Sequence, residues 1–137
     1  MKQERTNYMI NSKAFNYINV LEKAADASWL RGNLITNNIA NVSTPNYKRQ
    51  DVNFESVLFS ALSAAPDLDK AVNQLDVNSL SPQIYTDHSL SSYRLDGNNV
   101  DIDQEQANFA ENQIKYNALV DAINEEFNRL NRVLTNI

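Results

Sequence analysis

The sequence holds few of the residue types on which enzyme and metal chemistry usually depend. Among its 137 residues there are 0 Cys, so disulfides and thiolate nucleophiles are excluded. The single His, His88, disfavours histidine-rich metal sites and acid–base relays. Because His88 lies in a polar stretch, we interpret it as a surface residue. We expect no catalytic residue, no cofactor and no enzyme activity.

An acidic run and a basic pair are the remaining candidates for ligand binding. Asp96 to Asp103 gathers oxygen-rich side chains, but its Gly97 stands second, whereas an EF-hand loop needs glycine at the sixth position. We interpret the run as a turn followed by a helix N-cap and expect no metal. Lys48–Arg49 is too short for a nucleic-acid patch, and the net charge of −5 argues against such a partner. A structural turn or a protein contact is favoured for this pair.

Hydrophobic periodicity predicts a long helix at each end of the chain. Residues 12–42 and 103–136 both repeat apolar positions at alternating spacings of three and four, which is the pattern of a coiled-coil seam. Asp103, with Gln106 three residues later, would begin the second helix as a capping box. The seam positions expected to pack in an assembly are Ile18, Leu21, Ile35, Ile39, Tyr116, Val120, Ile123, Phe127, Leu130 and Leu134.

Some positions of these helices are open to more than one interpretation. Ser28, Gln106 and Gln113 are polar seam residues, and buried polar residues fix register or partner in coiled coils, so we expect these three to act as selectors. Trp29 lies off the seam. It is either exposed at a protein interface or buried in a wide seam.

The middle of the chain, residues 45–99, shows no sustained period. Residues 54–65 are apolar enough for a short helix that ends at Pro66. Residues 67–99 read as loop that allows one or two short strands. Asn46 follows a proline, where left-handed backbone would complete a type II turn.

The predicted fold is therefore mainly α. Two long terminal helices pair as an antiparallel coiled-coil hairpin, with an irregular middle that contains a short helix and room for short strands. One helix pair buries little apolar surface against about 1–2 kcal/mol of backbone entropy per ordered residue, so we expect the seams to belong to an assembly. No stretch reaches the roughly 18 apolar residues of a membrane span, and no apolar segment follows the charged start, so we expect no cleaved signal.

Two segments resemble bacterial flagellar axial proteins, the rod and hook family. Residues 37–49 read NNIANVSTPNYKR and are similar to the family's N-terminal signature. Residues 95–103 (LDGNNVDID) and 110–117 (AENQIKYN) resemble the start of the C-terminal helix in proximal-rod members. The chain departs from the pattern at Asn46, where the family usually has Gly, although Asn tolerates positive φ. The signature residues that match are Asn38, Ala40, Asn41, Thr44, Pro45, Tyr47 and Lys48.

The resemblance implies a structural subunit of the proximal rod of the flagellar basal body. Such a subunit would be exported by the flagellar type III apparatus, polymerise through its terminal helices and reside in the periplasmic rod. The implied partners are other rod subunits in a homo- or hetero-oligomer, the rod adaptor FliE, the MS ring and the export gate, with no nucleic acid or small-molecule substrate. The alternative is a soluble helical chaperone or adaptor that binds one flagellar partner.

The resemblance also implies an export motif and a division of the chain. Phe54 and Leu58 fit a family gate-recognition pattern, Phe-x-x-x-hydrophobic, and the alternative is a small amphipathic helix. We expect residues 1–137 to act as one rod-protein unit. It would contain an N-terminal helix and signature (12–44), the irregular middle (45–99) and a C-terminal helix (100–137).

Overall fold

The computed structural model describes residues 13–89 and 94–135, so the outermost residues of both predicted terminal helices lie outside the described part. The protein is mainly helical, with a small antiparallel sheet. Its elements in chain order are α1 (Lys13–Ala40), β1 (Gln50–Asn53), α2 (Glu55–Leu62), α3 (Leu68–Gln74), the short 3-10 helix η1 (Val77–Ser79), β2 (Gln83–Thr86) and α4 (Ile102–Thr135).

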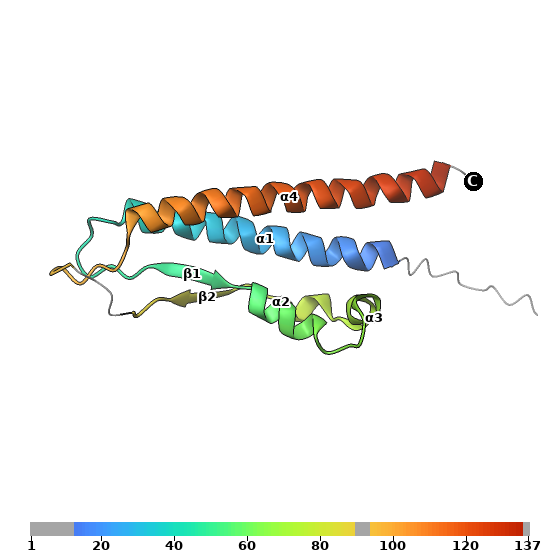
Figure 1. Cartoon of the computed structure of the whole chain (residues 1–137), viewed down its shortest axis with the longest axis horizontal. Coiled ribbons are helices and arrows are strands. Elements are labelled where there is room, and N and C mark those ends of the chain that lie inside the picture. The colour runs from blue at the N-terminus through green and yellow to red at the C-terminus, as the bar shows by residue number, and fades with distance from the viewer. Residues whose placement is uncertain (1–12, 90–93, 136–137) are drawn as a thin grey trace, which may run out of the picture.

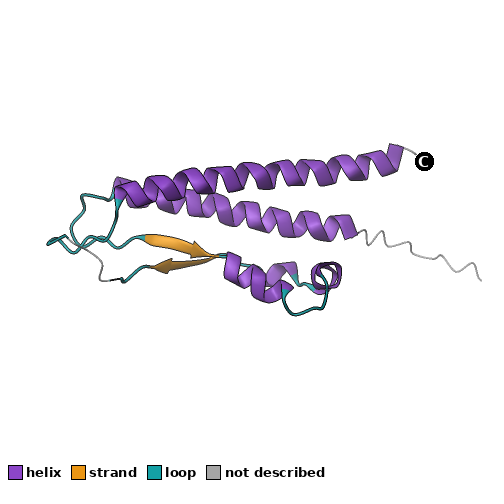
Figure 2. Ribbon diagram, viewed as in Figure 1, coloured by secondary structure: helices purple, strands orange, loops and turns teal. Residues whose placement is uncertain are grey.

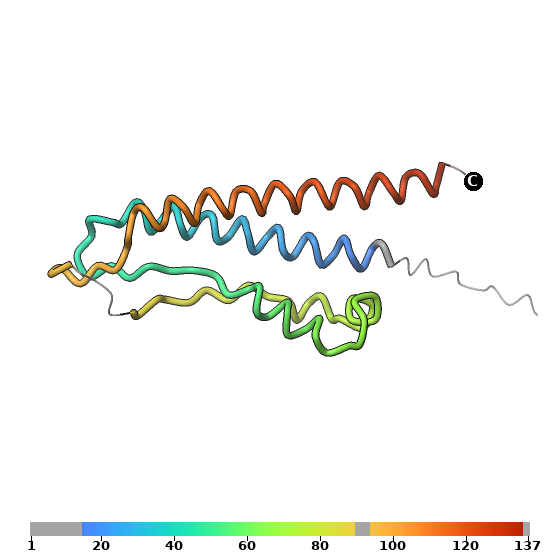
Figure 3. Tube along the Cα trace, viewed as in Figure 1, coloured from blue at the N-terminus to red at the C-terminus, as the bar shows by residue number. Residues whose placement is uncertain are grey.

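The long helix α1 lies between two layers. Helix α4 packs along one side of α1, and the short elements pack along the other side (Figure 1). The same arrangement is visible in the ribbon coloured by element type (Figure 2) and in the Cα trace (Figure 3). Ser28 bonds to Asn112 and Asn38 bonds to Glu105, so α1 and α4 run in opposite directions. The prediction of two long terminal helices that pack together is confirmed.

The predicted N-cap of α4, Asp103, is wrong by two residues. The carboxylate of Asp101 accepts hydrogen bonds from the backbone N–H groups of Asp103 (3.0 Å) and Gln104 (3.2 Å), so Asp101 is the N-cap. Both aspartates are good caps in sequence. The burial of Val100 fixes where the chain enters the helix, and this favours Asp101.

The middle of the chain is more regular than its sequence predicts. Strands β1 and β2 pair antiparallel, with Gln50 opposite Thr86 and Asn53 opposite Gln83. The predicted short helix is present as α2, and β2 falls in the stretch that allowed strands, whereas α3 and β1 were not predicted. The hydrophobic pattern does not predict strand β1, because the strand's buried side chain, Asp51, is charged rather than apolar.

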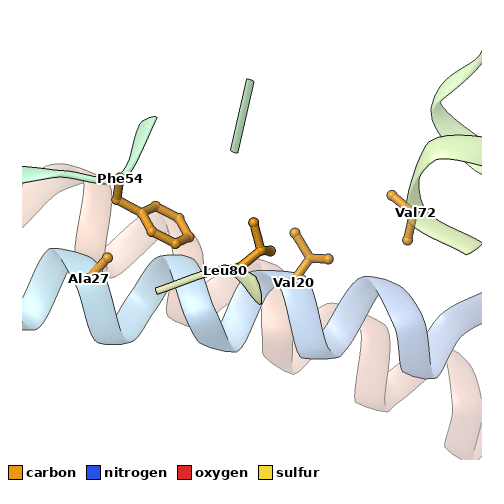
Figure 4. Close-up of a cluster of buried hydrophobic side chains, with 5 residues drawn as sticks. All are labelled: Val20, Ala27, Phe54, Val72 and Leu80. Atoms are coloured by element: carbon orange, nitrogen blue, oxygen red, sulfur yellow. The ribbon is translucent and has the colours of Figure 1, made fainter. Parts of the chain in front are cut away.

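The second layer supplies a hydrophobic core that the helix pair alone would lack. Val20 and Ala27 of α1 meet Phe54, Val72 and Leu80 from the short elements, as the close-up shows (Figure 4). All five are buried, and Leu80 has no exposed surface. A polar middle segment therefore contributes three widely spaced apolar anchors to one core.

Helix α1 is buried on two faces as a consequence. Leu34 (7% exposed) and Ile35 (0%) are adjacent residues of α1, so their side chains point to different sides of the helix, yet both are buried. By contrast, Trp29 is 62% exposed, which excludes its burial in a wide seam. Its role at a protein interface stays a prediction.

Candidate functional site

The signature residue Asn38 lies in the last turn of α1 and is fully buried. Its amide nitrogen donates to the backbone carbonyl of Gln50 (2.8 Å) and to Glu105 Oε2 (2.9 Å). Its amide oxygen accepts from the hydroxyl of Tyr47 (3.2 Å) and from the backbone N–H of Gln50 (2.9 Å). Both the nitrogen and the oxygen of this buried amide have hydrogen-bond partners. Another side chain at this position would leave some of these partners without a hydrogen bond.

The rest of the signature forms a tight turn after α1. The hydroxyl of Thr44 donates to Asn41 Oδ1 (3.1 Å), and the backbone N–H of Tyr47 donates to the carbonyl of Thr44 (3.3 Å). Between them follow Pro45 and Asn46, and Asn46 has φ of 60°. The left-handed backbone predicted for Asn46 is confirmed, and it accounts for the usual glycine at this position. Ala40 is exposed and ends α1.

A second loop, residues 96–99, docks against this turn. The amide nitrogen of Asn98 donates to the backbone carbonyls of Asn41 (2.9 Å), Val42 (3.1 Å) and Thr44 (2.8 Å). These three carbonyls belong to the turn that follows α1, so the Asn98 side chain ties the second loop to that turn. Sequence reasoning missed Asn98 as a functional residue, although it lies within one of the two segments that resemble the family.

Further contacts join the same two segments. The backbone N–H of Asn46 donates to the carbonyl of Asp96 (2.8 Å), and that of Arg49 donates to Asn99 Oδ1 (2.8 Å). The ammonium of Lys48 donates to the carbonyl of Gly97. The structure therefore places the two family-like segments, about 50 residues apart in sequence, in direct contact.

Arg49 is the centre of a partly buried ion-pair cluster. Its guanidinium contacts Asp51 (3.0 Å), Asp87 (3.3 Å) and Glu105 (2.9 Å), and Arg31 of α1 contacts Asp51 (2.8 Å). These five residues and Asn38 are named the polar junction below. The junction joins α1, β1, the end of β2 and the first turn of α4, so it holds the two layers together at one end of the protein.

The charges of the junction stabilise one another. Burial raises the pKa of the Asp51 carboxyl, but hydrogen bonds from Arg31, from the Val52 backbone N–H and from Arg49 outweigh this effect and lower the pKa below its ordinary value. Burial lowers the pKa of Arg49, but Asp51 and Glu105 raise it above its ordinary value. Asp51 and Arg49 are therefore both charged at neutral pH, and each stabilises the other within the junction.

In the first third of α4, a polar contact replaces apolar seam packing. Asn112 is 5% exposed and bonds to Ser28, while a Cβ added at Gly32 would lie 3.3 Å from the Asn112 amide nitrogen. The prediction that Ser28 is a buried polar seam residue is confirmed. Gln106 and Gln113 are exposed in the single chain, so their role as register or partner selectors in an assembly stays a prediction.

The buried polar positions of α4 are instead Glu105 and Asn112, seven residues apart. This spacing is one heptad, and it is the sequence signal that could have found them. They were missed because the apolar residues of α4 follow a neighbouring line along the helix. At 3.6 residues per turn, Ile123 and Leu130 lie 18 residues, or five turns, after Glu105 and Asn112, so the line of α4 that faces α1 begins polar and continues apolar.

A line of apolar residues directly beside this one is exposed over part of α4. Its members with the largest exposed fractions are Ile102 (41%), Phe109 (41%), Phe127 (47%) and Leu134 (66%), and we call these four the outer stripe. Tyr116, Val120, Ile123 and Leu130 are half-buried, as are Leu21 and Ile39 of α1, whereas Ile18 and Ile35 are buried. The role of the predicted seam in assembly stays a prediction.

The two predicted gate residues lie at the start of α2. Phe54 is 6% exposed and belongs to the hydrophobic core, and Leu58 packs against that core. In the folded chain, therefore, the aromatic ring is not available to a receptor. Recognition of this pair would require the chain to be unfolded.

The remaining candidates from the sequence have ordinary structural positions. His88 is exposed. The Asp96–Asp103 run is a turn followed by the N-cap of α4, as interpreted. Over residues 13–89 and 94–135, no group of three His, Cys, Asp or Glu side chains could hold a metal ion. None of the helices in this described part is long and apolar enough to cross a membrane.

The segment that forms most of α1 and the signature turn is shared with proteins of the flagellar rod. The family described as "Flagella basal body rod protein" matches residues 18–48, which cover most of α1 and the signature. The matched stretch includes Asn38 and the turn at Asn46.

Full-length relatives narrow the class. The chain is 38% identical over 122 residues to the flagellar basal body rod protein FlgB of Bacillus subtilis, covering 84% of this chain and 90% of that protein. It is 35% identical over 128 residues to FlgB of Borrelia hermsii (85% and 94%) and 29% identical over 113 residues to FlgB of Escherichia coli (76% and 82%). The chain belongs to the FlgB family of flagellar basal body rod proteins, whose place is the rod. None of these names describes an enzyme.

Proposed function

We propose that this protein is a structural subunit of the proximal rod, exported by the flagellar type III apparatus, and that it polymerises through α1 and α4. The observation that carries the proposal is the outer stripe. Exposed apolar patches of this length on a helix are typical of protein interfaces. Because these four side chains keep 41–66% of their surface exposed beside the contact with α1, the stripe is available to a neighbouring subunit.

The proposal includes partners and a role for the signature. The partners we propose are other rod subunits, the rod adaptor FliE, the MS ring and the export gate, and residues 1–137 would act as one unit. The seven signature residues would hold α1 against the start of α4, so that the outer stripe is presented in a fixed direction. Their contacts with the 96–99 loop and with Glu105 support this role.

A complementation experiment tests the function. The chain is expressed in a flagellar mutant that lacks its proximal-rod gene, and motility and rod formation are scored. We expect the unaltered chain to restore both, while Phe109→Asp and Leu130→Asp should be secreted but fail to build rods, because a charge in an apolar contact is costly. Ala107→Asp places the same charge at an exposed position of α4 outside the stripe and should still build rods.

Two results would contradict the proposal. If the unaltered chain is secreted but never enters a rod, the polymerising function is wrong. If Phe109→Asp and Leu130→Asp swim as well as Ala107→Asp, the terminal helices are not the assembly surface. A folded chain that stays in the cytoplasm bound to one partner would instead favour the chaperone or adaptor.

A further inference from the structure

A groove lies between α4 and the layer formed by β1 and α2, with residues of α1 between them. Its volume is about 790 Å³. Its apolar lining includes Ala24, Ala27, Phe54, Leu58, Ala118 and Leu119. A groove lined by small and apolar side chains receives the apolar face of an amphipathic helix. The groove therefore fits a helix as its occupant.

The last turns of α4 present such a helix face. Phe127 and Leu134 are 47% and 66% exposed, and Leu130 between them is half-buried. Their spacing of three and then four residues is the anchor pattern of helices that bind in grooves. All residues from 131 to 135 are exposed, so no described part of the chain covers this end of α4.

The groove carries a small excess of negative charge. Glu55 and Glu111 share one cation, Lys115, and the three side chains therefore sum to one negative charge. The other ion pair on the groove, Arg31 with Asp51, is neutral. A basic helix is thus a better occupant than an acidic one.

The end of α4 has the complementary sign. Residues 127–135 contain Arg129 and Arg132 and no acidic residue. The two arginines contact Glu126 and Glu125 on the preceding turn, but these pairs are solvent-exposed. Exposed pairs on a helix contribute little, so both cations can turn to a new partner at small cost.

The groove and the helix end cannot meet within one chain. Leu119 lines the groove and Phe127 begins the helix end eight residues later, about 12 Å along the same straight helix at 1.5 Å per residue. The occupant must therefore come from another molecule, and a second copy of this chain offers the matching segment.

We propose that the C-terminal turns of α4, residues 127–135, dock in this groove of a second copy. The inference rests on the proposed polymerisation through the terminal helices and names the two surfaces that meet. Each copy offers one groove and one helix end. Contacts of this head-to-tail kind leave a free surface at both ends of the assembly, so they generate an open-ended chain of subunits.

The sequence contains 0 Cys, so cross-links between introduced cysteines can be assigned without ambiguity. Ala118→Cys marks the groove, and Leu134→Cys marks the helix end. A disulfide needs Cα atoms within about 4.4–6.8 Å, so it forms only where the docked geometry brings the two positions together. We expect the mixed full-length variants to form a 118–134 dimer on oxidation, each variant alone to form none, and the double variant to form a ladder of oligomers.

Leu95→Cys is the matched control, because Leu95 is fully exposed and precedes the start of α4, far from position 134. It should not cross-link with Ala118→Cys. The same pairs are then oxidised in rods assembled in cells. Rods that form without a 118–134 link, or with a dominant 134–134 link, overturn the docking and leave the rod function intact. A chain that enters no rod contradicts the proposed function, and the docking is then decided on the purified protein, where absence of the link overturns it.

Discussion

Ser28 and Asn112 donate hydrogen bonds to each other in both directions across the contact between α1 and α4. The Asn112 amide donates to the Ser28 carbonyl (2.9 Å), and the Ser28 hydroxyl donates to Asn112 Oδ1 (3.1 Å). The closeness of Gly32 to the same amide shows that the two helices approach each other closely here. A polar pair therefore fixes the register of a helix pair whose apolar positions leave the register open.

Asn112→Ala tests this lock. We expect the free energy of unfolding to fall by about 1–3 kcal/mol, because the buried Ser28 hydroxyl loses its partner. Asn124→Ala makes the same substitution at an exposed position of α4 and should change stability by no more than about 0.5 kcal/mol. Urea denaturation followed by circular dichroism measures both. Equal midpoints for the two variants would show that the pair contributes nothing.

Arg49 should be the residue whose loss costs most at the polar junction. Arg49→Met leaves Glu105, which is 1% exposed, without its cation, and breaking a buried pair costs about 3–5 kcal/mol. Arg49→Lys should also destabilise, because an ammonium group cannot reproduce the geometry with which guanidinium contacts three carboxylates.

The matched control for this substitution is Arg129→Met, which removes an exposed ion pair on α4. Such pairs contribute at most about 1 kcal/mol, so its melting temperature should stay near that of the unaltered chain. If the melting temperature of Arg49→Lys equals that of the unaltered chain, the separate guanidinium contacts to the three carboxylates are not required for stability.

Acid should weaken the junction through Asp51. Since the folded-state pKa of this carboxyl lies below its ordinary value of 3.8, its contribution to stability is present above that value and is lost as the pH falls through the folded pKa. We expect Asp51→Asn to be less stable than the unaltered chain at pH 7. It should then lose less stability on acidification, so the two curves converge below about pH 4.

Urea titrations across this pH range measure the effect, with Asp121→Asn at an exposed site of α4 as the control. The control curve should run parallel to that of the unaltered chain. A constant gap between Asp51→Asn and the unaltered chain at every pH would mean that the Asp51 charge does not stabilise the fold.

Sequence reasoning found the features that depend on local pattern. Apolar spacing located α1 and α4 almost to the residue, and the proline before Asn46 predicted its left-handed backbone. These features are written in neighbouring residues, because helix periodicity and turn chemistry act over a few positions.

The missed features depend on contacts between distant segments. Asn98 bonds to carbonyls about 55 residues earlier in the chain, and Asp51 is buried only because Arg31 and Arg49 converge on it. Helix α3 buries only Ala71 and Val72, too few for a periodic signal. The local signal that could have predicted the start of α3 is its N-cap, Asp67, which accepts a hydrogen bond from the Lys70 backbone N–H.

The position of Phe54 in the core separates the two interpretations of the predicted gate motif. Phe54→Ala should destabilise the folded chain by about 3–5 kcal/mol, and Leu80→Ala, at the fully buried Leu80 of the same core, should cost about 2–5 kcal/mol without touching the motif. If the export gate reads Phe54 and Leu58, secretion should fall for Phe54→Ala and for deletion of residues 54–58, and should not fall for Leu80→Ala. Secretion into the medium, normalised to the cellular level of each variant, measures this. Equal secretion by all variants would leave Phe54 with a packing role alone, and equal loss by Phe54→Ala and Leu80→Ala would assign the effect to stability.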